Sequence, residues 1–296
     1  MSYISAIVQG LIQGFTEFLP ISSSGHLSLF QYFTGQSSES SLLFSVLLHF
    51  GTLLAVAIAF WPTIWELILE VFSFLKDLFT GRVFRVKPNA KRRMLFMLFL
   101  SCLPLLVIPF VQDQITSLSS DDSILAEGIG FLVTALLLTL ADHVVKGSKT
   151  AKNQTAVDAL VIGMAQACAT LPGISRSGST ICSGLLMGLS RSYAVAYSFI
   201  LGMPAILAAG LLDLGDIVSG TGAAENLSWG PALAGMLVGA VSGFFAIKLV
   251  NYIVKSDKFK VFAYYTLFLG LTVISIAVIE IFTDRAIQRI IISLIS

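Results

Sequence analysis

The chain has 296 residues, of which 56% are hydrophobic and 12% are charged, and its mean hydropathy is +0.88. A soluble domain carries about 25% charged and about 45–50% apolar residues, so this composition predicts a membrane protein whose partners are lipids. The net charge of +1 and the confinement of basic residues to short segments exclude the concentrated basic face that nucleic acid requires.

Six apolar segments are long enough to cross a bilayer, whose hydrocarbon core takes about 20 residues of helix. A further segment, 62–79, is apolar but contains Glu66, Glu70, Lys76 and Asp77. Because the two glutamates are four residues apart, we expect an amphipathic helix on the membrane surface or against the bundle. The predicted crossings are 42–60, 94–111, 125–141, 194–212, 230–254 and 261–282.

The charges between these segments predict their direction. Segments 80–93, 142–155 and 255–260 are rich in Lys and Arg, whereas 112–124 and 213–229 contain acidic residues and no basic residue. Basic loops stay on the cytoplasmic side. We therefore expect residue 193 inside, and residue 42 and both chain termini outside.

Segments 4–34 and 156–190 are too polar in the middle to be plain crossings. Since the first begins and ends outside and the second begins and ends inside, both are predicted to be re-entrant helical hairpins that enter from opposite faces. Irregular backbone at membrane depth is tolerated only where it is buried in protein or lines a watery cavity. The predicted half-helices are 4–19 and 27–34 around Pro20–His26, then 156–171 and 180–189 around Pro172–Ser179.

A shift of 153 residues aligns five residues of the first hairpin with identical residues of the second. Because the two halves have opposite predicted orientations, this predicts an inverted-topology repeat. The predicted fold class is an all-α polytopic membrane protein of one domain, 1–296, with six transmembrane helices, two re-entrant hairpins, and repeats 1–111 and 153–282. The aligned residues are Gly10, Gln13, Ser22, Ser24 and Gly25 with Gly163, Gln166, Ser175, Ser177 and Gly178.

The first turn combines hydroxyl groups with a carboxylate at membrane depth. Gln13 and Glu17 are four residues apart and share one helix face, and an ionisable group inside a membrane is a candidate functional group. His26 is a candidate acid, base or nucleophile. A structural hydrogen bond for Glu17 and a structural role for His26 are the alternatives. The turn also carries Ser22, Ser23, Ser24 and Gly25.

The second turn places Arg176 among hydroxyls and glycines. Glycines let backbone N–H groups approach a ligand closely, the following helix N-terminus favours anions, and a guanidinium binds phosphate oxygens with a rigid fork of donors. The turn is therefore predicted to hold an anion, although a structural ion pair of Arg176 with Glu17 is the alternative. Its other members are Gly173, Ser175, Ser177, Gly178, Ser179 and Thr180.

The remaining histidines and the cysteines are assigned structural roles. His49 lies in an apolar segment, and His143 lies near a helix end. Cys102, Cys168 and Cys182 lie in apolar stretches without the spacing of metal ligands. We expect the cysteines to act as small apolar residues.

Two long motifs resemble those of a known family. The chain closely resembles the undecaprenyl-diphosphate phosphatases, the bacitracin-resistance proteins of bacterial membranes, through QGFTEFLPISSSGH at Gln13–His26 and PGISRSG at Pro172–Gly178. The resemblance covers essentially the whole chain. It implies hydrolysis of undecaprenyl diphosphate to undecaprenyl phosphate and phosphate, which recycles the lipid carrier for peptidoglycan and confers bacitracin resistance. It also implies a plasma-membrane homodimer whose site faces the outer, periplasmic side.

The resemblance assigns the acidic group. The family's acidic motif, Glu or Gln followed four residues later by Glu, corresponds to Gln13 and Glu17. Glu17 is then the single carboxylate of the motif and the expected ligand of a divalent cation, Mg²⁺ or Ca²⁺. Because two oxygen ligands are too few for a protein cage, the cation is expected to be shared with the substrate's phosphates.

The same resemblance divides the chemistry between the turns. Arg176, with Ser175 and Ser177, is expected to hold the diphosphate and to stabilise charge on the transferring phosphoryl group. Three possibilities remain open for the attacking group: Ser23 with His26 as its base, a water molecule, or His26 itself.

A transporter or lipid flippase would also suit an inverted repeat with a site near the midplane. A carrier needs no nucleophile or base, so the Ser-Ser-Ser-Gly-His turn opposite an arginine favours a phosphatase. An intramembrane protease is less favoured, because the sequence has neither an HExxH nor a Gly-x-Gly-Asp motif.

Overall fold

The computed structural model describes residues 1–35, 42–82, 89–120, 123–144, 146–218, 227–256 and 258–295. Within these ranges the regular structure is helical, apart from an isolated bridge between Lys149 and Leu189, which confirms the all-α fold. Parts of the loops that predicted the topology, namely 83–88, 121–122, 145, 219–226 and 257, lie outside the described residues.

Five stretches of the described chain are long and apolar enough to cross a membrane, so the chain is a multi-pass membrane protein. They are Ala90–Ile115, Leu125–Asp142, Arg191–Gly215, Trp229–Lys255 and Lys260–Thr283, and they correspond to five of the six predicted crossings. The helices are α1 (Tyr3–Phe18), α2 (Ser23–Thr34), α3 (Leu42–Ala59), α4 (Trp61–Phe79), α5 (Ala90–Cys102), the 3-10 turn η1 (Leu103–Val107), α6 (Ile108–Ser120), α7 (Leu125–Asp142), α8 (Ala156–Cys168), α9 (Arg176–Leu186), α10 (Arg191–Val218), α11 (Trp229–Lys255), α12 (Lys260–Thr283) and α13 (Ala286–Ile295).

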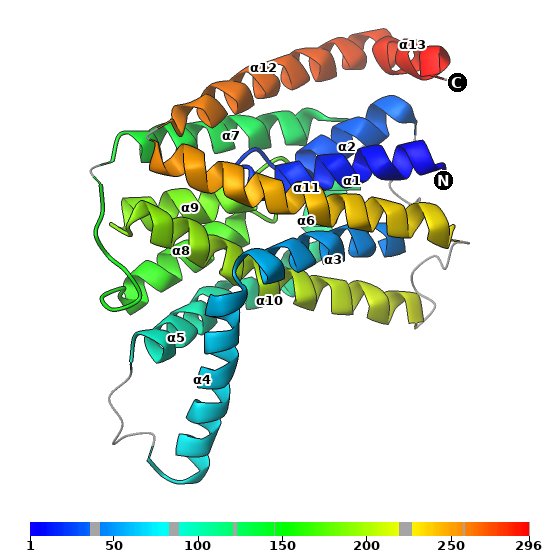
Figure 1. The fold of residues 1–296 in the computed structure, drawn as a ribbon. Coiled ribbons are helices and arrows are strands. Elements are labelled where there is room, and N and C mark those ends of the chain that lie inside the picture. The colour runs from blue at the N-terminus through cyan, green and yellow to red at the C-terminus, as the bar shows by residue number, and fades with distance from the viewer. Residues whose placement is uncertain are drawn as a thin grey trace.

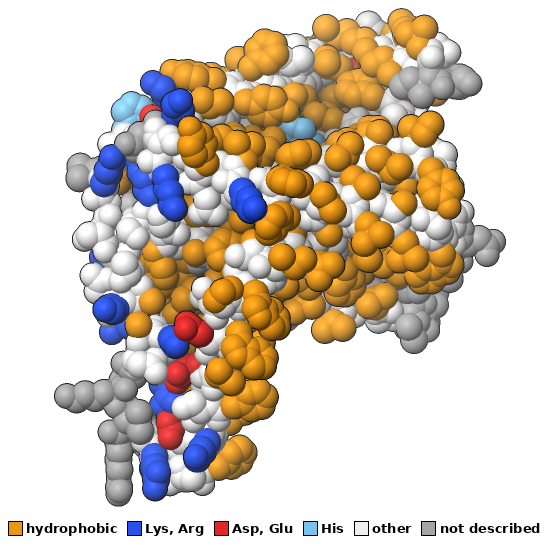
Figure 2. Space-filling model, viewed as in Figure 1, with side chains coloured by type: hydrophobic (Ala, Val, Ile, Leu, Met, Phe, Trp, Pro, Cys, Tyr) orange, Lys and Arg blue, Asp and Glu red, His pale blue; other side chains and the backbone are white. Residues whose placement is uncertain are grey.

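The sixth predicted crossing, 42–60, is α3, which meets α4 at a bend of 90°. Helix α4 leaves the bundle across the direction of the other helices (Figure 1). Its polar side is held to α5 by Arg92, which pairs with Glu70 at 2.5 Å and with Asp77 at 2.7 Å. Charged and apolar side chains gather on opposite sides of α4 (Figure 2), in agreement with the amphipathic helix predicted for 62–79.

Helices α1 and α2 form one hairpin and α8 and α9 form another, and the two enter the bundle from opposite ends (Figure 1). Their turns meet in the interior, where a Cβ on Gly25 would lie 3.2 Å from the Cα of Gly173. Gly173 has φ +78°, and a Cβ there would lie 2.3 Å from the carbonyl oxygen of Glu127, so only glycine fits this close approach. A buried hydrophobic cluster joins both hairpins to the long helices and includes Phe18, Ile181, Leu201 and Ile247.

Both predicted turns are shorter than the sequence suggested. Helix α2 begins at Ser23 rather than at residue 27, and α9 begins at Arg176 rather than at residue 180. The physical reason is N-terminal capping: the Ser22 hydroxyl accepts a hydrogen bond from the amide of Gly25, and the Ser175 hydroxyl accepts one from Gly178. The polar motifs therefore form the first turns of two helices.

Glycines let each hairpin pack on a helix from the other half of the chain. A Cβ on Gly10 of α1 would lie 2.4 Å from the carbonyl oxygen of Gly235 of α11. In the same way, a Cβ on Gly163 of α8 would lie 2.4 Å from the carbonyl oxygen of Ser101 of α5. Small residues of this kind bring membrane helices close together. The repeat boundaries 1–111 and 153–282 stay a prediction.

Candidate functional site

A cavity of about 370 Å³ lies where the two hairpin turns meet α3 and α10. This volume falls in the range of about 300–1,000 Å³ that is typical of small-molecule sites. The first hairpin lines it with a carboxylate and hydroxyls, the second with a guanidinium and hydroxyls, and α10 with mostly small apolar residues. The lining residues are Thr16, Glu17, Ser22, Ser23, Ser24, Ser45, His49, Ala169, Thr170, Ile174, Ser175, Arg176, Ala205, Ile206, Ala209, Gly210 and Asp213.

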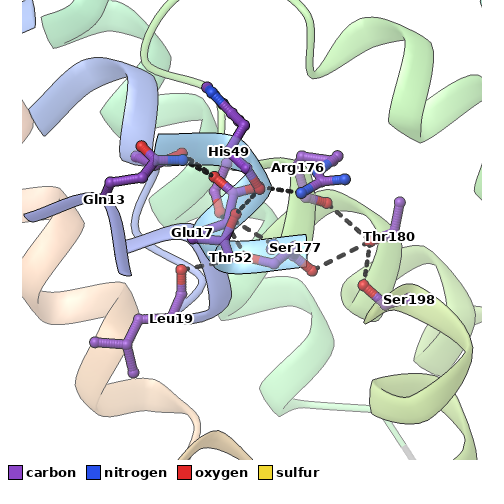
Figure 3. A network of polar contacts seen from close by, with 12 residues as sticks. Gln13, Glu17, Leu19, His49, Thr52, Arg176, Ser177, Thr180 and Ser198 are labelled. Atoms are coloured by element: carbon purple, nitrogen blue, oxygen red, sulfur yellow. Dashed lines mark hydrogen bonds and ion pairs between the residues drawn. The ribbon is translucent and has the colours of Figure 1, made fainter. Parts of the chain in front are cut away.

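Glu17 is the centre of a polar network that joins the two hairpins (Figure 3). Arg176 Nη2 donates to Glu17 Oε1. The other carboxylate oxygen, Oε2, accepts from Ser23 Oγ at 2.6 Å and from Gln13 Nε2 at 3.0 Å. The Glu17 side chain is 5% exposed and that of Arg176 is 23% exposed. A carboxylate buried to this extent is stable only with such partners.

The N-termini of α2 and α9 both lie at the cavity, since their capping residues Ser22 and Ser175 line it. Ser22 has φ +71°, a backbone conformation that is costly for a residue with a side chain and is concentrated at functional sites. The amide of Ser175 donates to Thr134 Oγ1 at 3.0 Å, which holds the second turn against α7. Helix N-termini aimed at a cavity favour an anionic ligand.

Several predicted site residues lie behind the cavity wall rather than on it. Ser177 Oγ donates to the carbonyl oxygen of Leu19 at 3.2 Å, and Thr180 Oγ1 lies 2.6 Å from Ser198 Oγ. These contacts brace the second turn against the first turn and against α10. The predicted residues that do not line the cavity are Gln13, Gly25, His26, Gly173, Ser177, Gly178, Ser179 and Thr180.

His26 is turned toward α12. Its Nδ1 lies 2.7 Å from the carbonyl oxygen of Ser22, and its Nε2 lies 2.7 Å from the hydroxyl of Tyr265. The His26 and Tyr265 rings are stacked, with centroids 5.8 Å apart. The structure therefore brings Ser23 to Glu17 and brings His26 to Tyr265, a residue that the sequence analysis did not single out. The catalytic role of His26 stays a prediction.

His49 lines the cavity, although the sequence analysis assigned it a structural role. The missed signal was a polar stripe on an apolar helix: Ser45 and His49 are four residues apart, and Thr52 follows three residues later. Thr16, Thr170 and Asp213 are the other polar lining residues that were missed.

His143 lies exposed at the end of α7. All three cysteines are free thiols. Cys182 is buried and Cys168 is exposed, and none of the three lines the cavity.

A metal ion could bind at this site only if a bound phosphate or water supplied most of its coordinating oxygens. Among the residues that the structure describes, no cluster of three or more His, Cys, Asp or Glu side chains could hold a metal ion. Both oxygens of Glu17 already accept hydrogen bonds. A hard cation takes six or more oxygen ligands, so most of them would have to come from a bound phosphate or from water.

The fold and the cavity together define a class: a multi-pass helical membrane protein with a buried, ion-paired site between two helix N-termini. The model of the family described as "Bacitracin resistance protein BacA" matches residues 6–272. A protein named undecaprenyl-diphosphatase from Halothermothrix orenii is 40% identical over 278 residues, which cover 94% of this chain and 99% of the relative.

Proteins with the same name from Methanosphaera stadtmanae and Bacteroides fragilis are similar along their whole length. The first is 36% identical over 94% of this chain and 99% of its own. The second is 33% identical over 95% of this chain and 100% of its own. The chain therefore belongs to the bacitracin resistance protein BacA family.

Proposed function

We infer that the chain is an undecaprenyl-diphosphatase, which hydrolyses undecaprenyl diphosphate to undecaprenyl phosphate and inorganic phosphate. The names of its relatives support this function and give no support to the transporter alternative. The observation that carries the proposal is the arrangement of Arg176, Glu17 and Ser23 in one cavity at the N-terminus of α9. The reaction would return the lipid carrier to peptidoglycan synthesis and thereby confer resistance to bacitracin.

Arg176 is proposed to bind the diphosphate. Its guanidinium is held by Glu17 in the free site and would turn toward the phosphate oxygens, to which it can donate two parallel hydrogen bonds. The N-terminus of α9 adds an electrostatic contribution in the same place. The binding set proposed around it is Gln13, Ser22, Ser24, Gly25, Gly173, Ser175, Ser177, Gly178, Ser179 and Thr180, with those behind the cavity wall acting by positioning.

The proposed reaction is a displacement at the terminal phosphorus. An oxygen nucleophile forms a bond to that phosphorus, the bond to the bridging oxygen breaks, and undecaprenyl phosphate leaves with the electron pair. The candidate nucleophiles are water and Ser23, whose hydroxyl donates to Glu17. After a serine attack, water would cleave the phosphoserine and release inorganic phosphate. His26 would reach the substrate only after Tyr265 releases it. Mass spectrometry of protein quenched during turnover separates the candidate nucleophiles, because only a serine attack leaves phosphate on Ser23.

We propose that Mg²⁺ or Ca²⁺ binds together with the substrate, held by its phosphate oxygens and by Glu17. The lining supports this, because Glu17 and Asp213 bring carboxylate oxygens to the cavity, and hard divalent cations take oxygen ligands. When bound, the cation would offset the negative charge of the diphosphate. Excess EDTA is expected to suppress phosphate release and added Mg²⁺ or Ca²⁺ to restore it. Full turnover in EDTA would remove the cation from the proposal.

We propose that the site faces the outer side of a bacterial plasma membrane and that the protein is a homodimer. Lys and Arg gather at the end of the molecule away from the chain termini (Figures 1 and 2), and such residues mark the cytoplasmic side. The cavity is lined by the first half of α3 and the last half of α10, which run toward the opposite end. Both termini would also be outside.

Phosphate release by the purified protein tests the proposed activity. In detergent, the enzyme is expected to release phosphate from undecaprenyl diphosphate and from shorter prenyl diphosphates. In liposomes, a flippase would instead move the lipid between leaflets without cleaving it. Movement without cleavage would overturn the proposal.

A further inference from the structure

The three histidines of the chain share one local arrangement. In each, the ring nitrogen Nδ1 lies within hydrogen-bond distance of the carbonyl oxygen four residues earlier on the same helix. Because a carbonyl oxygen only accepts, Nδ1 carries the proton in all three, and in the neutral ring Nε2 is an acceptor. The pairs are His26 with Ser22 at 2.7 Å, His49 with Ser45 at 2.8 Å and His143 with Thr139 at 2.7 Å.

The surroundings of Nε2 differ among the three. For His26, Nε2 lies against the hydroxyl of Tyr265. His143 is exposed at the end of α7. His49 alone of the three histidines lines the cavity, together with Glu17 and Ser23. Its ring is half-buried and is oriented by the Ser45 carbonyl.

We propose that His49 is a further catalytic residue, the general base of the reaction; this rests on the proposed phosphatase function. As an attacking water bonds to the terminal phosphorus, its proton passes to the Nε2 lone pair of His49. The electron pair of the breaking bridge bond leaves with undecaprenyl phosphate, and His49 then returns the proton to that product or to water.

Glu17 accepts a hydrogen bond from the hydroxyl of Ser23 and is the base within reach of a serine attack, but it is less suitable for an attacking water. Its two oxygens already accept three hydrogen bonds, from Arg176, Ser23 and Gln13. A base held in the right tautomer by a second group, here the carbonyl of Ser45, is the usual arrangement for activating a nucleophile.

His49→Gln tests the assignment, since glutamine keeps similar bulk and hydrogen-bonding ability but cannot take the proton. General base catalysis contributes about 10²–10⁴-fold to rate, so kcat is expected to fall by at least about 10²-fold while KM changes little. His143→Gln is the matched control, because His143 has the same backbone hydrogen bond outside the cavity, and it should retain the wild-type kcat. Melting temperatures in detergent verify that each variant is folded.

Chemical rescue separates a proton-transfer role from a structural one. In His49→Ala, added imidazole is expected to restore part of the lost kcat, whereas Arg176→Ala should gain nothing from it. A His49→Gln enzyme with wild-type kcat would overturn the proposal, and so would a folded His49→Ala enzyme that imidazole does not rescue. If the wild-type protein itself releases no phosphate, the proposed function fails instead, so the two failures are distinguishable.

Discussion

Gly202 of α10 lies directly against the guanidinium of Arg176. A Cβ at this position would come within 2.3 Å of Arg176 Nη1. The atom it meets is the end of a flexible side chain, which can swing aside without unfolding the protein. The absence of a side chain at residue 202 therefore determines where the guanidinium can lie.

Gly202→Ala is expected to lower phosphate release by about 10²-fold, the effect of moving a catalytic group by roughly 1 Å, and to leave the melting temperature almost unchanged. Gly215→Ala is the control in the same helix, since a Cβ there meets nothing within 4 Å, and it should be fully active. Equal activity of the two variants would argue against Arg176 as the binding group.

At the residue scale, the sequence indicated the chemistry of the site better than it indicated which residues line the cavity. Glu17, Ser23 and Arg176 stand in long polar motifs and could be picked out directly. The role of His49 could not be predicted, because it depends on which side of α3 faces the cavity. Tyr265 is far from both motifs in the chain and meets His26 only through the packing of α12.

At the scale of elements, the contact of α1 with α11 depends on missing side chains. Gly10 and Gly235 bring the two helix backbones together, and a Cβ on Gly10 would meet a carbonyl oxygen at 2.4 Å. Unlike the end of an arginine, a backbone carbonyl cannot move without shifting its helix. This contact holds the helix that carries Glu17.

Gly10→Ala is expected to lower the free energy of unfolding by about 1–3 kcal/mol, the usual effect of overpacking a tight contact. The reason is that α1 and α11 must separate to admit the methyl group. Gly239→Ala in the same interface is the control, because its Cβ would sit at an ordinary 3.5 Å from the carbonyl oxygen of Gly10. Thermal unfolding in detergent measures both, and a normal melting temperature for Gly10→Ala would contradict the account.

Hydropathy predicted the long helices well because each is apolar over its whole length. It placed the starts of α2 and α9 four residues too late, because the serines and glycines there are typical of loops as well as of capped first turns. The bend of 90° between α3 and α4 was implied only by the charges within 62–79.

At the scale of the whole molecule, the two hairpins bring parts of the chain that are 159 residues apart into one ion pair, between Glu17 and Arg176. No single segment contains the site. The cavity exists only when the first hairpin, the second hairpin, α3 and α10 are assembled, so folding and activity should be lost together when this assembly fails.

The proposed orientation can be measured with an impermeant thiol reagent on intact cells. Ser2→Cys is expected to react, because the N-terminus is proposed outside and Ser2 is exposed. Lys152→Cys, also at an exposed position, should react only after the cells are made permeable, because it lies in a loop proposed inside. The parent chain gives the background from its native cysteines, and the reverse pattern would invert the proposed topology.

The rate of phosphate release from undecaprenyl diphosphate, compared between the purified wild-type protein and Arg176→Ala, tests the central claim most directly. The wild type should release phosphate and leave undecaprenyl phosphate. Arg176→Ala should be slower by at least about 10²-fold, as expected for the loss of a group that stabilises transferring charge, and should still insert and purify, since Glu17 keeps Ser23 and Gln13 as partners. A wild-type protein that releases no phosphate, or an Arg176→Ala protein that is equally fast, would contradict the account.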